Sequence, residues 1–370
     1  MPRKLTADFL VAGAGSFGSW TALELAHRGY SVILADPYGA GNARASSGGE
    51  TRIIRASYGA ARHYTKMAVE SLAAWRHLFA AQNKRELFHP CGALFTAEPG
   101  NSFLEASADA LRDLRVNTRR LTAKALAKQY PQVQFGAGRE GLLEPDSGVL
   151  MARRAVQLVT EVAEQQGVHV VREPVDPARI KSRFQVGATI FACGPWLPQI
   201  FPEELGSRIW PTRQEVFFFG AGPAYAPAKF PAWVDFGATY YALPDIENRG
   251  LKIAFDSHGP AIDPDRDTRI VTPASVRRMR QVIAQIMPTL KDAPIVETRV
   301  CQYENTSNGD FLIDWLRPGI LAVGGGSGHG FKHGPAVGKI AADLAEGKIE
   351  IPPSQFAFSV KATKKARQIF

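Results

Sequence analysis

A glycine-rich turn near the amino terminus carries the residue types with the clearest chemistry. It reads Gly13-Ala14-Gly15-Ser16-Phe17-Gly18, between an apolar run over residues 8–12 and a helical pattern that continues to Arg28. Glycines at this spacing are typical of turns that bind the pyrophosphate of a dinucleotide. In such turns Gly13 permits the tight bend, Gly15 lets the backbone approach the pyrophosphate, and Gly18 lets helix and strand pack closely.

The segments around the turn supply the structural context that this motif requires. A second apolar run, residues 31–35, follows the helix and ends on Asp36. A helix that begins near Ser16 presents free N–H groups and the positive end of its dipole to a phosphate. A carboxylate about 20 residues past the turn accepts hydrogen bonds from ribose hydroxyls. The segment therefore predicts a dinucleotide site, although a glycine turn alone would also fit an ordinary α/β domain.

Composition and charge bound the class of protein. The 370 residues are 45% apolar and 21% charged, with a net charge of +9, which is ordinary for a globular enzyme of about two domains. No apolar run approaches the roughly 20 residues of a membrane span. We therefore expect a cytoplasmic protein with no membrane and no nucleic-acid partner. One basic cluster, expected to be a solvated terminus rather than a nucleic-acid-binding arm, is Lys361, Lys364, Lys365 and Arg367.

The cysteines do not suggest a structural role. Cys91, Cys193 and Cys301 are far apart and odd in number, so they predict neither a disulfide framework nor a zinc site. We accordingly expect no bound metal.

Hydrophobic periodicity predicts a mixed order of strands and helices. Strands are expected over residues 91–96, 168–171, 187–192, 214–219, 240–243, 251–255 and 320–323. Helices are expected after Gly59 and over residues 102–129, 153–166 and 273–286. A second glycine loop, residues 324–332, follows the last strand, and a helix with Pro335 in its first turn follows the loop. The carboxy-terminal part of the chain is thus predicted to contain a second strand–glycine–helix unit.

Two arginines lie just after the polar loop that follows Asp36. Arg52 and Arg55 flank an apolar pair in the short segment Thr51-Arg52-Ile53-Ile54-Arg55. Solvated surface charge is one interpretation. Their place beside a predicted cofactor loop favours the other, in which at least one of them belongs to the site.

Three pieces of sequence together identify a family resemblance. They are residues 51–55, Cys301, and the run Gly328-His329-Gly330-Phe331-Lys332. On these residues the chain resembles the amine oxidases of the D-amino-acid-oxidase superfamily, and within it monomeric sarcosine oxidase and N-methyltryptophan oxidase, from Gly13 to about Phe358. The resemblance implies an FAD cofactor held in an extended pose.

The resemblance also implies the fold class and the domain division. It implies an α/β fold in which a Rossmann-like FAD-binding domain is interleaved with an α+β substrate domain, whose antiparallel sheet covers the flavin. The FAD-binding domain would comprise residues 1–85, 150–210 and 300–370. The substrate domain would comprise residues 86–149 and 211–299.

Several side chains match the family's functional positions. Cys301 matches the cysteine that bonds covalently to the flavin, although a buried, inert thiol is the common alternative. Arg55 and Lys332 match the pair that binds the substrate carboxylate. Arg52 and Lys252 match cations near the flavin, on the face where oxygen reacts. Tyr241 and His329 match polar groups that line the substrate side; for His329 a structural role is the alternative, and for Lys252 a solvent-facing position on its strand.

The family match extends to further cofactor contacts. Besides Gly13, Gly15, Gly18 and Asp36, the cofactor-binding residues would be Ser16, Phe17, Ser46, Ser47, Thr51, Arg52, Val175, Gly194, Trp196, Cys301, Gly326, Gly328, Gly330, Phe331 and Lys332.

Two departures from the family bear on the substrate. Sarcosine oxidases carry histidine just before the Gly-acid-Thr-Arg motif, where this chain has Ser47-Gly48. They also carry histidine four residues after the lysine that matches Lys252, where this chain has Asp256. A carboxylate there would tolerate a second cationic or hydroxyl group on the substrate, or pair with a local arginine.

The resemblance implies an oxidase of secondary or N-methylated amino acids. The carboxylate of the substrate would be held by Arg55 and Lys332, and the uncharged amine would be oxidised to an imine that water hydrolyses. Dioxygen would be reduced to hydrogen peroxide, and the enzyme would be monomeric. The alternatives are a flavin-dependent amine dehydrogenase with another electron acceptor, an NAD-dependent dehydrogenase, and a basic nucleic-acid-binding protein.

Overall fold

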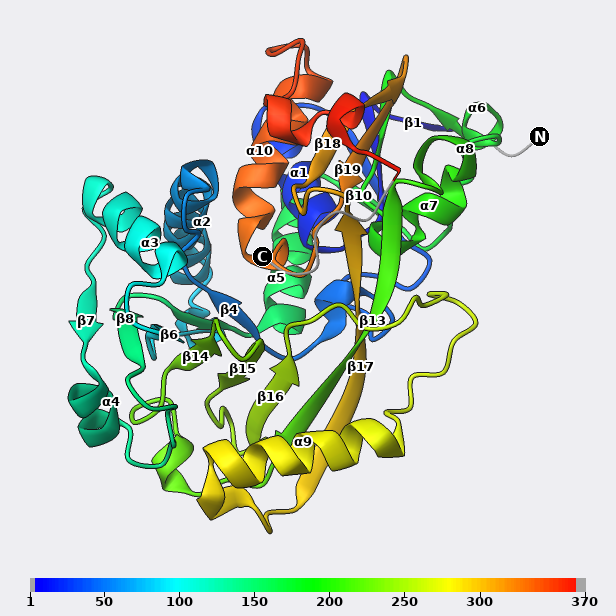
Figure 1. The fold of residues 1–370 in the computed structure, drawn as a ribbon. Helices are drawn as coiled ribbons and strands as arrows, with labels where there is room; N and C mark the ends of the chain where they lie inside the picture. Colours follow the sequence, from blue (N-terminus) through cyan, green and yellow to red (C-terminus); the bar gives the residue numbers. More distant parts are fainter. Residues whose placement is uncertain (1–3, 364–370) are drawn as a thin grey trace.

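Two large sheets dominate the computed structural model, which describes residues 4–363 (Figure 1). A six-stranded sheet occupies the upper part of the view in Figure 1 and an eight-stranded sheet the lower part. This arrangement confirms the expected mixed α/β class. The long strands β13 (Ile209–Phe219) and β17 (Ile295–Thr306) pair along their length and extend between the two parts.

The six-stranded sheet contains the predicted dinucleotide motif. Neighbouring strands are parallel except for the last pair. The four residues of β2 are all buried, as expected for a parallel strand that is covered on both faces. In order across the sheet the strands are β10 (His169–Val171), β3 (Val32–Ala35), β2 (Phe9–Ala12), β12 (Ala188–Phe191), β19 (Ile320–Gly324) and β18 (Leu312–Arg317).

Helices cover the six-stranded sheet. Helix α1 (Ser16–His27) follows β2 and packs against both α5 (Ala152–Gln165) and α10 (Gly334–Ala345). Helix α2 (Arg62–Ala81) packs against α10 on the outside. The two helices that follow the two glycine loops, α1 and α10, are therefore in direct contact.

The eight-stranded sheet is antiparallel apart from one parallel pairing, between β14 and β6. One face is covered by α9 (Pro273–Ile286), whose first turn is capped by the Thr272 side chain. Apolar residues of α9 share a core with Phe217 and Ile253. In order the strands are β17, β13, β16 (Leu251–Phe255), β15 (Tyr240–Leu243), β14 (Ala232–Asp235), β6 (Ala93–Ala97), β8 (Glu140–Glu144) and β7 (Arg119–Leu121).

Smaller elements complete the fold. A three-stranded sheet joins β4 (Arg52–Ile54), β9 (Gly148–Leu150) and β5 (Phe88–His89), and β1 (Leu5–Thr6) pairs with β11 (Phe184–Gln185). The remaining helices are α3 (Ser102–Asp113), α4 (Ala123–Gln129), α6 (Ile180–Arg183), α7 (Leu197–Ile200) and α8 (Pro202–Leu205). Within the described residues no helix is long and apolar enough to cross a membrane.

The prediction of continuous helix over residues 102–129 was wrong in its middle. Helix α3 ends before Arg115, whose φ of 56° is incompatible with further helix. Strand β7 follows and pairs with β8, and Thr122 then caps α4. Pairing with β8 determines the structure of residues 119–121, and helical periodicity in the sequence cannot indicate such a pairing.

The basic tail differs from expectation at Lys361, which is not solvated. Its side chain is buried, and Nζ donates to Asn308 Oδ1 (3.1 Å), to the Asp310 carbonyl (3.2 Å) and to the Gln355 carbonyl (2.7 Å). Burial lowers the pKa of Lys361 to about 8. Three oxygen acceptors offset the cost of burying this ammonium. Lys364, Lys365 and Arg367 lie outside the described residues.

The division into two domains stays a prediction. Its boundaries at residues 210 and 299 fall inside β13 and β17, the two strands that extend between the sheets in Figure 1.

Candidate active site

A cavity of about 420 Å³ opens where the parallel strands β2, β12 and β19 end. Ligands of open α/β sheets bind at this carboxyl edge. Strand β17 supplies another wall of the cavity. The predicted cofactor contacts that line it are Gly13, Gly15, Ser16, Phe17, Asp36, Ser46, Ser47, Arg52, Val175, Gly194, Trp196, Cys301, Gly326, Gly328, Gly330 and Phe331. Gly18, Thr51 and Lys332 are not among the lining residues.

The first glycine turn has the geometry that its sequence predicts. Gly13 has a φ of 101°, which favours glycine. A side chain at Gly18 would place its Cβ 1.8 Å from the Gly13 carbonyl oxygen, so this glycine lets α1 begin directly against the turn. The Ser16 N–H donates to Ser47 Oγ (3.1 Å), and Ser16 Oγ donates to the Phe331 carbonyl (2.8 Å). Ser16 thereby connects both glycine loops.

Asp36 lines the cavity with its carboxylate already oriented by backbone groups. Oδ2 accepts from the N–H of Ala14 (2.9 Å), and Oδ1 accepts from those of Tyr38 (2.8 Å) and Gly39 (2.7 Å). A carboxylate oxygen accepts more than one hydrogen bond. Asp36 therefore keeps acceptor capacity for a ribose hydroxyl while it fixes the turn after β3.

The second glycine loop packs against the first. A Cβ at Gly330 would lie 2.8 Å from the Phe17 ring, and a Cβ at Gly338 would lie 2.7 Å from the Trp20 backbone. Glycines at these positions allow α10 and its loop to approach α1 closely. The two strand–glycine–helix units thus pack against each other, and residues from both glycine loops line the cavity.

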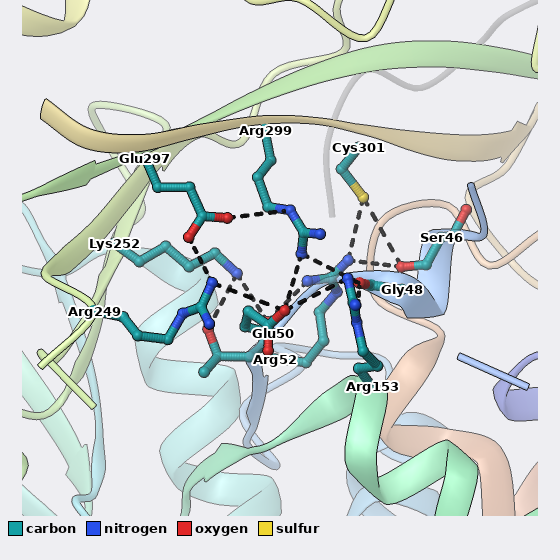
Figure 2. A network of polar contacts seen from close by, with 11 residues as sticks. Ser46, Gly48, Glu50, Arg52, Arg153, Arg249, Lys252, Glu297, Arg299 and Cys301 are labelled. Atoms are coloured by element: carbon teal, nitrogen blue, oxygen red, sulfur yellow. Dashed lines mark hydrogen bonds and ion pairs between the residues drawn. The ribbon is translucent and has the colours of Figure 1, made fainter. Parts of the chain in front are cut away.

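Cys301 and Arg52 both line the cavity and contact each other there (Figure 2). The Nη2 group of Arg52 donates to Cys301 Sγ (3.2 Å) and to the Ser46 carbonyl (2.7 Å). Burial opposes the charge of Arg52, but its pKa is raised overall by Cys301, Tyr241 and other neighbours. The guanidinium is therefore a fixed cation next to the sulfur, and Cys91, Cys193 and Cys301 are all free thiols.

Lys252 points inward, so the solvent-facing alternative is wrong. Alternation along β16 turns Ile253 toward α9 and Lys252 toward the opposite face. The lysine is 3% exposed, and its Nζ donates to the Thr51 carbonyl (2.8 Å). Burial and the nearby Arg52 lower the pKa of Lys252 well below its usual value.

A network of charges extends outward from Lys252 and Arg52 (Figure 2). Glu50 pairs with Arg153 (3.5 Å), Arg249 (3.9 Å) and Arg299 (3.5 Å). Glu297 pairs with Arg249 (2.6 Å) and Arg299 (3.3 Å). In the residues drawn in Figure 2, cations outnumber carboxylates, so this side of the cavity is positive.

Two basic side chains contact Tyr58: Arg55 lies against its ring, and Lys332 donates to its hydroxyl. Arg55 is 8% exposed, donates to the Ser57 carbonyl, and lies with Cζ 3.9 Å from the centre of the Tyr58 ring. Lys332 is 3% exposed and donates to Tyr58 Oη (2.9 Å) and to the His329 carbonyl (2.8 Å). The surface interpretation of Arg55 is therefore wrong. Two buried cations thus contact one aromatic ring, and neither is among the residues that line the cavity.

The electrostatics of these cations indicate which ligand would suit them. Burial lowers the pKa of Lys332 well below its usual value, and repulsion from Arg55 lowers it further. Asp256 and Glu144 offset this only in part. Glu144 is itself saturated by Ala56 N–H (2.8 Å) and by three donors from Ser57 and Ser147. An added carboxylate between Arg55 and Lys332 would therefore be electrostatically favoured.

Asp256 lies beside the same cations. Tyr303 Oη donates to Asp256 Oδ1 (3.4 Å), and Arg55 and Lys332 both act on its charge. Burial raises the pKa of Asp256 to about 6, because it outweighs the three stabilising neighbours. Tyr241 lies on the adjacent strand β15, and burial raises its pKa. The Nζ atom of Lys252 lies 5.9 Å from the centre of the Tyr241 ring.

His329 engages both ring nitrogens within the protein. Nε2 lies 3.0 Å from the Gly309 carbonyl, so it carries the proton, and Nδ1 lies 3.3 Å from Tyr58 Oη. His333 Nε2 lies 2.7 Å from the same hydroxyl. These contacts favour the structural alternative for His329, as a support of Tyr58, and its catalytic role stays a prediction.

Sequence patterns missed several residues of the cavity wall. Gln302, Tyr303 and Glu304 all line it beside Cys301. Alternation along the strand from the predicted attachment cysteine could have indicated Tyr303, but not Gln302 or Glu304, whose side chains leave the strand on the other face. Asp265 also lines the cavity, where its Oδ1 accepts from Trp196 Nε1 (3.0 Å). It comes from a loop that no pattern connected with the site. No cluster of three or more His, Cys, Asp or Glu side chains could hold a metal in residues 4–363.

This fold and cavity define a dinucleotide-binding oxidoreductase. The chain belongs to the DAO family of FAD dependent oxidoreductases, which matches residues 8–344. It is 30% identical to monomeric sarcosine oxidase from Bacillus sp. (strain NS-129), over 97% of this chain and 98% of that protein. It is 27% identical to N-methyl-L-tryptophan oxidase from Salmonella arizonae, over 91% of this chain and 94% of that protein.

Solved structures show the same fold. L-proline dehydrogenase from P. horikoshii superposes with a TM-score of 0.81 at 19% identity, over 96% of this chain and 98% of that one. The open form of NikD, an amino acid oxidase of nikkomycin biosynthesis, superposes with a TM-score of 0.77 at 21% identity, over 96% and 98%.

The residues present fit FAD. The helix terminus at Ser16 suits a pyrophosphate, and Asp36 keeps acceptor capacity for a ribose. A side chain at Gly13 would collide with Ala192, and one at Gly330 would collide with Phe17 and Gly326, so only glycine fits in these two turns. The protein is an FAD-dependent oxidoreductase, and the nicotinamide alternative is wrong.

Proposed function

We propose that this enzyme oxidises secondary or N-methylated amino acids with dioxygen as electron acceptor. The products are an imine, which water hydrolyses, and hydrogen peroxide. The observation that carries the proposal is the pair of buried cations, Arg55 and Lys332, which both contact Tyr58. The names of the curated relatives, sarcosine oxidase and N-methyl-L-tryptophan oxidase, describe substrates with the same two groups, a carboxylate and a methylated amine.

The clamp residues orient the substrate. Charge-assisted hydrogen bonds from Arg55 and Lys332 hold the carboxylate, and the fixed geometry brings the C–H bond next to the amine into a reactive position. Tyr58 contacts both cations, and its hydroxyl is in turn supported by His329 and His333. Because both cations are already buried, binding requires little reorganisation of the protein.

Bound FAD supplies the electron-pair acceptor and returns the electrons to dioxygen. Its proposed contacts are the glycine turns at Gly13 and Gly326, the carboxylate of Asp36, and a covalent bond from Cys301. Lys252 and Arg52 are proposed to act in the oxygen step, since they place fixed positive charge beside Cys301. The protein's own contribution is orientation and charge.

Asp256 is proposed to select among substrates. Its carboxyl group faces the clamp cations and receives the Tyr303 hydroxyl. A substrate with a second cationic or hydroxyl group would interact with this carboxylate, whereas sarcosine has no such group. We therefore propose a substrate larger or more polar than sarcosine. The monomeric state and the cytoplasmic location stay predictions.

The test is anaerobic mixing of the purified enzyme with a panel of N-methylated and cyclic amino acids. A substrate should bleach the visible flavin absorption, and readmitted oxygen should restore it with release of hydrogen peroxide. If no member of the panel bleaches the flavin, the amine-oxidase proposal is wrong. Bleaching followed by very slow recovery in oxygen would instead identify a dehydrogenase with another acceptor.

A further inference from the structure

Two side chains in the cavity wall contain hydrogen-bond acceptors for which residues 4–363 supply no donors. Gln302 and Glu304 occur two residues apart on β17, and both line the cavity. Gln302 Nε2 donates to the Arg44 carbonyl (3.0 Å), while Gln302 Oε1 has no partner in the described part of the chain. Glu304 Oε1 accepts from the Gly326 N–H (3.2 Å), while Glu304 Oε2 likewise has no partner there.

The position of Glu304 is unusual for a carboxyl group. It is 7% exposed, and no ion pair reaches it within residues 4–363. A Cβ at Gly324 would lie 3.1 Å from Oε2, and a Cβ at Gly326 would lie 3.3 Å from Oε1. Two glycines therefore make room for the carboxyl group. Burial raises the pKa of Glu304 to about 7 despite the backbone N–H groups of Gly325 and Gly326.

Buried acceptors without donors destabilise a protein unless a ligand supplies the donors. Residues two apart on a strand share one face and are separated by about 6.6 Å. The missing donors must therefore come from a ligand segment with at least two donor groups several ångströms apart. A phosphate has no such donors at neutral pH, and its charge would be repelled by a carboxylate.

The cavity fixes which part of FAD reaches these residues. Asp36 and Val175 line the cavity just after β3 and β10, at one edge of the six-stranded sheet, whereas Gly194 and Gly326 line it after β12 and β19, further across the sheet. Gln302 and Glu304 follow Cys301 along β17, and the Glu304 carboxyl group lies next to Gly194 and Gly326. In an extended FAD, the ribityl chain connects the flavin ring to the pyrophosphate and carries three hydroxyl groups.

We propose that Gln302 and Glu304 form a polyol-binding face that accepts hydrogen bonds from the ribityl hydroxyls of FAD. Glu304 Oε2 and Gln302 Oε1 each bind one hydroxyl. The inference rests on FAD occupying this cavity and is independent of the amine that the enzyme oxidises.

The test measures cofactor affinity rather than turnover. The Cys301→Ser variant serves as the reference protein, because any flavin bound to it can be exchanged. Apoprotein is titrated with FAD and with three analogues that each lack one ribityl hydroxyl, and flavin fluorescence reports the Kd. The variants are Glu304→Ala, Glu304→Gln and Gln302→Ala. Asn305→Ala is the matched control, since its amide bonds Trp210 and Thr212 and does not line the cavity.

Glu304→Ala should weaken FAD binding about 10- to 100-fold, because the acceptor for one ribityl hydroxyl is lost from a buried site. Glu304→Gln should retain most of the affinity, since it keeps an oxygen acceptor. For the analogue that lacks the partner hydroxyl, Glu304→Ala and the reference should bind equally. Gln302→Ala should show the same pattern with a different analogue.

Two results would overturn the proposal. One is an equal loss for FAD and all three analogues in Glu304→Ala, which is the pattern expected of Asn305→Ala and of any purely structural defect. The other needs no substitution at position 304: if the reference protein binds all three analogues as tightly as FAD, no ribityl hydroxyl has a partner here. Both results are measurements of FAD affinity, so they can be interpreted even if the enzyme oxidises none of the amines tested.

Discussion

The Nη2 group of Arg52 lies 3.2 Å from the sulfur of Cys301, and the same nitrogen donates to the Ser46 carbonyl. The sulfur is thus held at the cavity wall by a cation that is itself fixed by backbone. Thiolates, not thiols, are the nucleophilic form of cysteine. A guanidinium at this distance would stabilise negative charge on the sulfur while it forms a bond to the flavin. That bond would replace the thiol hydrogen and one C–H hydrogen of the flavin, and dioxygen, the acceptor of the proposed reaction, would take up both hydrogens as hydrogen peroxide.

Cys301 is therefore predicted to form a thioether to the flavin. Acid precipitation of the purified enzyme should leave the yellow colour in the pellet, and the mass of the polypeptide should be increased by one FAD. Cys301→Ser should release any flavin on denaturation. A wild-type mass equal to that of the bare polypeptide, in protein fully loaded with flavin, would contradict the assignment.

Arg55→Ala and Lys332→Ala are predicted to lose the carboxylate clamp. Each change removes a charge-assisted contact in a buried site, which should cost about 1.5–3 kcal/mol, or about 10- to 150-fold in apparent affinity. Competitive inhibition by simple carboxylates, such as acetate derivatives, should weaken to the same extent. Lys66→Ala, an exposed change on α2, is the control. Unchanged inhibitor affinity in both clamp variants would refute the clamp.

Asp256 is predicted to set the ranking of substrates. Sarcosine should be a poor substrate in a panel of N-methylated and cyclic amino acids, because it has no group for this carboxylate. Asp256→His, which restores the residue type found in sarcosine oxidases, should shift the ranking toward sarcosine. If sarcosine is the best substrate and Asp256→His leaves the ranking unchanged, Asp256 does not select the substrate.

The raised pKa of Asp256 predicts two pH effects of known sign. The folded value, about 6, lies above the ordinary 3.8, so the folded state loses stability as pH rises between these values. Asp256→Asn should therefore raise the Tm more at pH 7 than at pH 4. Because the charged form attracts a cationic group, kcat/KM should rise through pH 6, and this rise should be absent in Asp256→Asn. A rise that persists in the variant belongs to another group.

The dinucleotide half of the fold was predictable because its signals are local. Gly13 and Gly18 occur within one turn, and the apolar runs on either side are short and continuous. Each glycine has a steric reason in the structure that the motif already implies. The division of residues 102–129 was not predictable in this way, since β7 is fixed by pairing with β8.

The polar parts of the site show the same limit. Cys301 and Lys332 were found from a family pattern, but the contact of Tyr58 with both Arg55 and Lys332 was not. Glu304 was missed because a single glutamate in a strand reads as a solvent-facing residue. Only the closure of β17 over the glycine loop buries it. Lys361 was misplaced for the related reason that two of its three acceptors, at Asn308 and Asp310, come from a segment distant in the sequence.

Lys252 is predicted to accelerate the reaction of the reduced enzyme with dioxygen. Its ammonium is almost fully buried and is held by the Thr51 carbonyl, one residue before Arg52. Burial and Arg52 both lower its pKa. An anion that arrives beside these two groups therefore relieves repulsion between them as well as gaining direct attraction.

Dioxygen becomes anionic when it accepts the first electron, and a fixed cation in a dry site stabilises that charge without reorganisation. Preorganised charge of this kind can contribute about 3–4 kcal/mol. Lys252→Met should accordingly slow reoxidation of the reduced enzyme by about 100- to 1,000-fold, while anaerobic reduction by the amine changes much less. Stopped-flow measurements separate the two half-reactions. Arg249→Met, at the exposed edge of the same charge network, is the matched control and should slow reoxidation far less, because water screens its charge. Equal slowing of both half-reactions in Lys252→Met, or of neither, would remove Lys252 from the oxygen step.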